Sequence, residues 1–222
     1  MSLAGTATVV APILSRDTVA ADLGAFYTAS TVPGTGLLGH AVSTTFVETK
    51  AIFQVFNGGA LTIYPLYLRM TVTVASVGNT MVQFTTVLDQ GNRFSAFVAG
   101  NALTPVNQNM NSTATSMAQV NAGAVTLTTA TANRRIVSHR PFRPTTVGAN
   151  IGVIGDVYQF SYGSGELVDP SGLPVDAASR AHIMYVTSPL VIPPGMMLAI
   201  HAWGATYSTG ATMEYELGFV EK

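Results

Sequence analysis

One histidine of the chain stands at a spacing that some metalloenzymes use. His201 follows the turn Pro193-Pro194-Gly195, with five residues between Gly195 and the histidine. In such enzymes a second histidine stands close by, but here that place is taken by Trp203. A catalytic metal site needs about three protein ligands. The pattern therefore predicts a structural histidine, with no metal and no other cofactor.

No other group of residues forms a recognisable catalytic pattern. His40, His139 and His182 lie far apart in the sequence, and the chain has no cysteine. A Gly-x-Ser-x-Gly elbow, a Walker loop and a dinucleotide fingerprint are all missing from the sequence. Because nothing supplies a nucleophile, a base and an orienting group at known spacing, we expect that the protein is not an enzyme.

Four of the ten basic residues lie in one short stretch, Arg134, Arg135, Arg140 and Arg143. They could form a phosphate-binding patch with Phe142 as a stacking ring, or pair with carboxylates across a subunit interface. The net charge of −1 favours the interface, since condensing nucleic acid requires an excess of positive charge. We expect no direct contact with nucleic acid.

The charged fraction of the sequence is unusually low. Charged residues make up 9% of the 222 residues and apolar residues 48%, whereas a soluble domain has about 25% charged residues. Such a surface is expected to be covered by other subunits or built from uncharged polar side chains. With no cysteine for disulfides, stability must come from packing and association. We expect an assembly component made in a cytoplasm, without a membrane span or signal peptide.

From Thr45 onward, short alternating apolar segments separated by turn residues predict β-strands. Alternation is clearest at 47–55, 66–74 and 82–88, and it recurs in a final strand at 213–219, where successive side chains would face opposite sides of a sheet. The Asn-, Thr- and Ser-rich stretch 99–118 lacks this pattern and predicts a long loop that is functional or contacts a partner. We expect an all-β protein, a jelly-roll β-sandwich of about eight to ten antiparallel strands.

The first part of the chain differs from the rest in composition. Residues 1–42 are rich in Gly, Thr, Ala and Pro and predict an extended N-terminal arm with a short strand or helical turn, followed by a sandwich domain at 43–222. The arm has more apolar residues than a solvated tail needs, so it should dock on the body or on a neighbour. Its candidate contact residues are Ile13, Leu14, Phe26 and Tyr27.

The strand predicted at 196–203 is apolar on both faces. One face would cover the core, and the other would be covered by a helix, the arm or another subunit. Met197, His201 and Trp203 share this second face. They are therefore candidate interface residues, together with the four arginines.

Several stretches of the chain resemble virion proteins of tailed bacteriophages. The resemblance lies in Pro189-Leu-Val-Ile-Pro-Pro-Gly-Met-Met-Leu-Ala-Ile-His-Ala-Trp203, Met213-Glu-Tyr-Glu-Leu-Gly-Phe-Val-Glu221, Asn101-Ala-Leu-Thr-Pro-Val-Asn-Gln-Asn-Met110 and Gly155-Asp-Val-Tyr-Gln-Phe160. These stretches are similar to jelly-roll head decoration, or cement, proteins. The resemblance implies a subunit on the capsid exterior, commonly a homotrimer, that binds the major capsid protein and bridges capsomers against internal DNA pressure.

Two alternatives fit the same fold class. The chain could be a receptor- or glycan-binding virion module, with Tyr158, Tyr162, Trp203 or Tyr207 as stacking platforms. It could also be the major coat protein of a small jelly-roll virus, in which case it would assemble into closed shells by itself.

Overall fold

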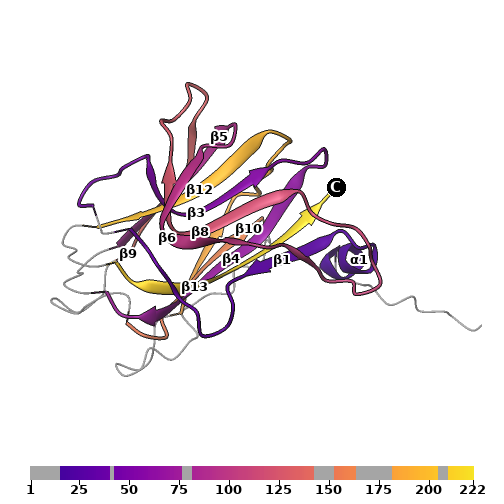
Figure 1. The fold of residues 1–222 in the computed structure, drawn as a ribbon, viewed down its shortest axis with the longest axis horizontal. Coiled ribbons are helices and arrows are strands. Elements are labelled where there is room, and N and C mark those ends of the chain that lie inside the picture. Colours follow the sequence, from indigo (N-terminus) through magenta and orange to yellow (C-terminus); the bar gives the residue numbers. More distant parts are fainter. Residues whose placement is uncertain (1–15, 41–42, 77–81, 143–152, 164–181, 205–209) are drawn as a thin grey trace, which may run out of the picture.

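The computed structural model describes residues 16–40, 43–76, 82–142, 153–163, 182–204 and 210–222, which form two β-sheets packed face to face and one short helix (Figure 1). The helix is α1 (Arg16–Asp22). Sheet A has the order β11 (His182–Thr187), β10 (Val157–Tyr162), β4 (Ile63–Val74), β13 (Thr212–Glu221), β1 (Phe26–Ser30) and β7 (Val106–Asn107), and β2 (Leu37–Leu38) also pairs with β13. Sheet B has the order β6 (Phe94–Leu103), β8 (Ala118–Leu127), β3 (Lys50–Asn57), β12 (Met196–Trp203), β5 (Val82–Gln90) and β9 (Arg135–Phe142). Neighbouring strands are antiparallel, except that β10 and β11 are parallel.

The main hydrophobic core lies between the two sheets, as the alternating sequence predicts. In β13, Tyr215, Leu217 and Phe219 are buried, whereas Glu214 and Glu216 on the opposite face are only partly buried. The ring of Tyr215 stacks on Phe53 of sheet B at a centroid distance of 6.2 Å. An all-β sandwich with almost no helix is therefore confirmed.

The strand count exceeds the predicted eight to ten, because the described residues contain thirteen strands. Two of the additional strands, β6 and β7, fall partly or wholly in the stretch 99–118 that was predicted to be a loop. β6 is an edge strand and most of its side chains are exposed or partly exposed. Its sequence therefore lacks the alternation that burial on one face imposes on a strand.

The predicted N-terminal arm contributes directly to sheet A. Five residues of β1 pair with β13, from Phe26 opposite Val220 to Ser30 opposite Glu216. Tyr27 is buried and stacks on Phe219 at 5.6 Å, so this part of the predicted arm docks on the body, one of the two predicted alternatives, and Tyr27 belongs to the core and not to a contact with a partner. Phe26 is partly buried. The predicted boundary at residue 42 would therefore separate β1 from the sheet to which it belongs. The predicted contact residues Ile13 and Leu14 lie outside the described residues.

Candidate functional site

His201 is a structural residue at the centre of sheet B. Its strand β12 lies between β3 and β5, and Gly195, the residue just before the strand, has a φ of 76°, a conformation that favours glycine. The imidazole is 1% exposed, and its Nδ1 lies 2.9 Å from the backbone oxygen of Lys50. Because a carbonyl oxygen only accepts, Nδ1 carries the proton. Nε2 has no hydrogen-bond partner among the residues that the structure describes.

Burial keeps His201 uncharged. Desolvation lowers its pKa from 6.5 to about 4, with smaller contributions of the same sign from Arg93 and His40, while the carbonyls of Lys50 and Val47 act in the opposite direction. Burial also lowers the pKa of His40, whose Nε2 lies 2.7 Å from the carbonyl oxygen of Val125. Within the described ranges, no three His, Asp or Glu side chains gather at a spacing that could hold a metal ion.

A second apolar cluster covers the outer face of β12. It consists of Ala51, Val125, Leu127, Met197 and Ala199, with Phe56, Phe94 and Phe97 packed against it. The rings of Phe94 and Phe97 lie 4.7 Å apart. Met197 is 0% exposed. Burial of β12 on both faces is thus confirmed, but the covering residues belong to the same chain. The predicted roles of Met197 and His201 in a subunit contact are wrong, because their side chains cannot reach a partner.

Trp203 ends β12 closer to the surface and is partly buried. Its Nε1 donates to Thr85 Oγ1 at 3.0 Å, and the same hydroxyl lies 3.0 Å from His139 Nδ1. The exposed ring of His139 stacks on the indole at 5.6 Å. Trp203 therefore remains a candidate contact residue, although one of its faces is already covered.

Two of the predicted glycan-stacking tyrosines lie in the interior. Tyr158 and Tyr162 are both buried in the main core, and burial removes the open ring face on which a sugar would stack. Tyr207 lies outside the described residues. The structure therefore gives little support to a glycan platform built from these aromatic rings.

The arginine stretch forms part of the free edge of sheet B. Arg134 pairs with Glu48 of the same chain, and its predicted pairing with a carboxylate of another subunit stays a prediction. Arg135 and Arg140 on β9 are exposed, and no ion pair joins either of them to another described residue. We call these two residues the arginine edge. Arg143 lies outside the described residues.

A buried ion pair fixes the loops beside this edge. Arg93 NH1 lies 2.9 Å from Asp89 Oδ2, and both side chains are almost completely buried. Burial alone would raise the pKa of Asp89, but hydrogen bonds from Thr131 and Gln90 and the charge of Arg93 lower it overall. Arg93 also donates to the carbonyl of Thr128. The sequence shows only a turn here, although a carboxylate and a guanidinium four residues apart were a signal for such a pair.

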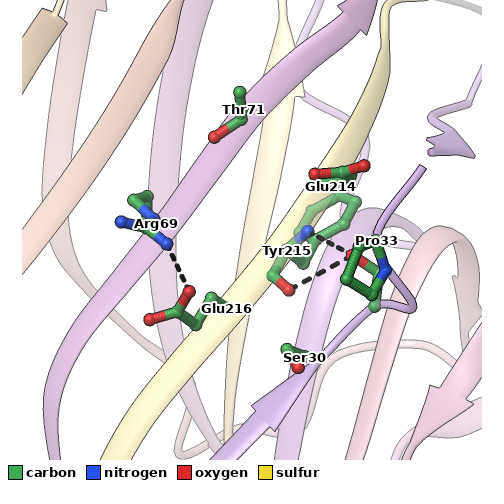
Figure 2. A pocket seen from close by; sticks show the side chains of 8 residues that line it. Ser30, Pro33, Arg69, Thr71, Glu214, Tyr215 and Glu216 are labelled. Carbon is green, nitrogen blue, oxygen red and sulfur yellow. Dashed lines mark hydrogen bonds and ion pairs between the residues drawn. The ribbon is translucent and has the colours of Figure 1, made fainter. Parts of the chain in front are cut away.

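A polar cleft of about 190 Å³ opens at β1, β4 and β13. Its lining includes Ser30, Pro33, Arg69, Thr71, Glu214 and Glu216 (Figure 2). Glu216 accepts hydrogen bonds from Tyr67 and Arg69. Glu214 Oε1 accepts one from the backbone N–H of Gly34 at 2.7 Å. The cleft therefore contains one carboxylate that is already neutralised by an arginine and one that is not.

The segment after β7 lies beside α1 at the end of the molecule shown on the right of Figure 1. The side chain of Asn107 donates to the carbonyl of Gly24, and that of Asn109 donates to the carbonyl of Asp22. These bonds fix the segment beside α1. Leu23 is 74% exposed, Met110 is 99% exposed, and Val106 is also exposed. We call Leu23, Val106 and Met110 the apolar tip.

Comparison of the chain with protein-family models, curated proteins and solved structures found no match. Among the described residues, no helix is long and apolar enough to cross a membrane. Any function must therefore be argued from the surface features of the chain itself.

Proposed function

We propose that the chain is a structural virion protein, a decoration subunit that binds the outside of a tailed-phage capsid as a homotrimer and bridges neighbouring capsomers. The sequence resemblance and the β-sandwich fold support the proposal. The proposal includes a jelly-roll topology for the two sheets. A subunit of this kind acts through contact surfaces, which also provide stability that a chain without cysteine cannot obtain from disulfides.

The apolar tip is the observation that carries the proposal. Large exposed apolar side chains that lie on neighbouring segments can form a binding surface, and only 9% of the residues are charged. Leu23 and Met110 expose most of their side chains. Burying each of them against a partner would contribute about 1.5–3 kcal/mol. The tip is therefore the surface that we assign to the major capsid protein.

The tip is also organised before binding. Asn107 and Asn109 connect its two segments through side-chain bonds to the backbone of Gly24 and Asp22, and the backbone N–H of Gln108 donates to the carbonyl of Phe26. Ordering a loop on binding costs free energy. Because these bonds already hold the loop, more of the contact energy is available for attachment.

The position of β1 changes how this attachment has to be tested. If 1–42 were only an arm, its deletion would abolish capsid binding and leave the body folded. β1 instead contributes the buried Tyr27 and Ala29 to the core, so this deletion would remove part of the sheet. Single side chains at the tip give a cleaner test.

The test uses the double variant Leu23→Ser/Met110→Ser. Heads of the phage that encodes the chain, purified from a mutant lacking its gene, are mixed with protein and pelleted. We expect binding to weaken at least about tenfold, since two apolar contacts are lost. Val98→Ser is the matched control, because Val98 on β6 is 74% exposed but lies outside the tip. Equal pelleting of the double variant and the wild type would overturn the assignment of the tip.

A further inference from the structure

The ion pairs of the chain leave particular charges unpaired. Arg69, Arg93 and Arg134 each pair with a carboxylate of their own chain, namely Glu216, Asp89 and Glu48. Among the arginines whose side chains the structure describes, this leaves Arg135 and Arg140 without a carboxylate partner. Both arginines are exposed on the edge strand β9, and a guanidinium is well suited to an ion pair across an interface.

Glu214 is the acidic counterpart inside the polar cleft. Its single hydrogen bond within the described residues comes from Gly34 and engages Oε1, which leaves Oε2 available. The hydroxyls of Ser30 and Thr71 line the same cleft and have no hydrogen-bond partner in the described part of the chain. Figure 2 shows Arg69 directed at Glu216 and not at Glu214.

The cleft has the size and chemistry to accept an arginine head group. Its volume of about 190 Å³ is many times the roughly 10–15 Å³ that one water molecule needs by the same measure. Glu214, Glu216 and Arg69 together give it a formal charge of −1. A guanidinium presents five N–H donors in a planar fork. These donors could bond to the free oxygen of Glu214 and to the neighbouring hydroxyls of Ser30 and Thr71.

We infer that the arginine edge of one copy docks in the polar cleft of a second copy, with Arg135 or Arg140 paired to Glu214. The two surfaces differ, so the contact is heterologous, and it closes into a ring when the rotation between copies permits. The inference rests on the homo-oligomer of the proposed function and names the contact that builds it. It does not involve the apolar tip.

The experiment measures mass by light scattering over a range of concentrations. Glu214→Gln keeps an acceptor for Gly34 and removes the charge, and Arg135→Glu/Arg140→Glu reverses the other side. We expect each change to weaken association at least about tenfold, since a desolvated charge pair is lost. The triple variant Arg135→Glu/Arg140→Glu/Glu214→Arg exchanges the charges within one chain and should associate again. Asp22→Asn is the control, because it removes an exposed carboxylate outside the cleft.

A wild-type chain that stays monomeric at every concentration would overturn the inference. The inference would also be overturned if the Glu214 and arginine variants left the mass of the oligomer unchanged. The same holds if the charge-exchanged chain stays dissociated while circular dichroism shows that it is folded. Head pelleting is measured separately. An oligomer that responds to these variants but does not bind heads would reject the decoration function and leave the inference standing.

Discussion

Replacing His201 with glutamine should make the protein less sensitive to acid. The imidazole is buried, and its pKa is about 4, compared with 6.5 for an unperturbed histidine. Glutamine does not titrate, and its amide can still donate to the Lys50 carbonyl that Nδ1 now contacts. The variant therefore removes the titratable imidazole of His201 but keeps a hydrogen-bond donor for the carbonyl of Lys50.

The expected size of the effect follows from the two pKa values. As the pH falls below 6.5, the imidazole of His201 becomes protonated in the unfolded chain. In the folded chain it becomes protonated only near pH 4. The unfolded state binds more protons in this window, so the free energy of unfolding decreases as the pH falls. Each tenfold difference in proton affinity is worth about 1.4 kcal/mol. The wild type should thus lose about 3 kcal/mol between pH 7 and pH 4 through this one group.

Urea unfolding at pH 7 and pH 4 measures the effect, at one fixed protein concentration because association also contributes to stability. The pH dependence of His201→Gln should be smaller than that of the wild type by about 3 kcal/mol. The pKa of His40 is also lowered, but His40 is present in both proteins and cancels. His139→Gln, which replaces an exposed imidazole, is the control for the loss of a histidine at the surface. If His201→Gln lost as much stability as the wild type at pH 4, the argument from burial would be refuted.

Two further predictions concern the core. Tyr27→Ala should lower the free energy of unfolding by about 3–5 kcal/mol, because a buried aromatic ring in sheet A is lost. Urea unfolding measures this loss. A loss below about 1 kcal/mol would show that β1 is not needed for the fold. Arg93→Ala should cost about 3–5 kcal/mol, because Asp89 would stay buried without its partner. Arg69→Ala, which removes the more exposed pair with Glu216, should cost at most about 1 kcal/mol, and similar losses in the two arginine variants would contradict the difference in burial.

Strands buried on one or both faces could be predicted because burial leaves a local pattern. Glu214 and Glu216 alternate with the buried Tyr215 and Leu217, and the apolar run of β12 predicted two covered faces. β6 could not be found in this way, because an edge strand with exposed side chains has no need of alternation.

The roles of single residues were harder to predict because their partners are distant in sequence. His201 bonds to the carbonyl of Lys50, 151 positions away, and Arg134 pairs with Glu48. The segment that packs on Met197 could not be predicted either. The sequence shows that one face of the strand is apolar, but it does not show which part of the chain covers that face. Exposure of Met110 depends on side-chain bonds from Asn107 and Asn109 to a turn far earlier in the chain.

The proposed decoration function is tested most directly by adding the wild-type protein to expanded heads of the phage that carries the gene, purified from a mutant that lacks it. Solution mass is measured first by light scattering, and the amount of protein that pellets with the heads is then determined. The account predicts a small oligomer that pellets at a fixed, saturable ratio to the major capsid protein. A protein that remains in the supernatant at saturating concentration would contradict it.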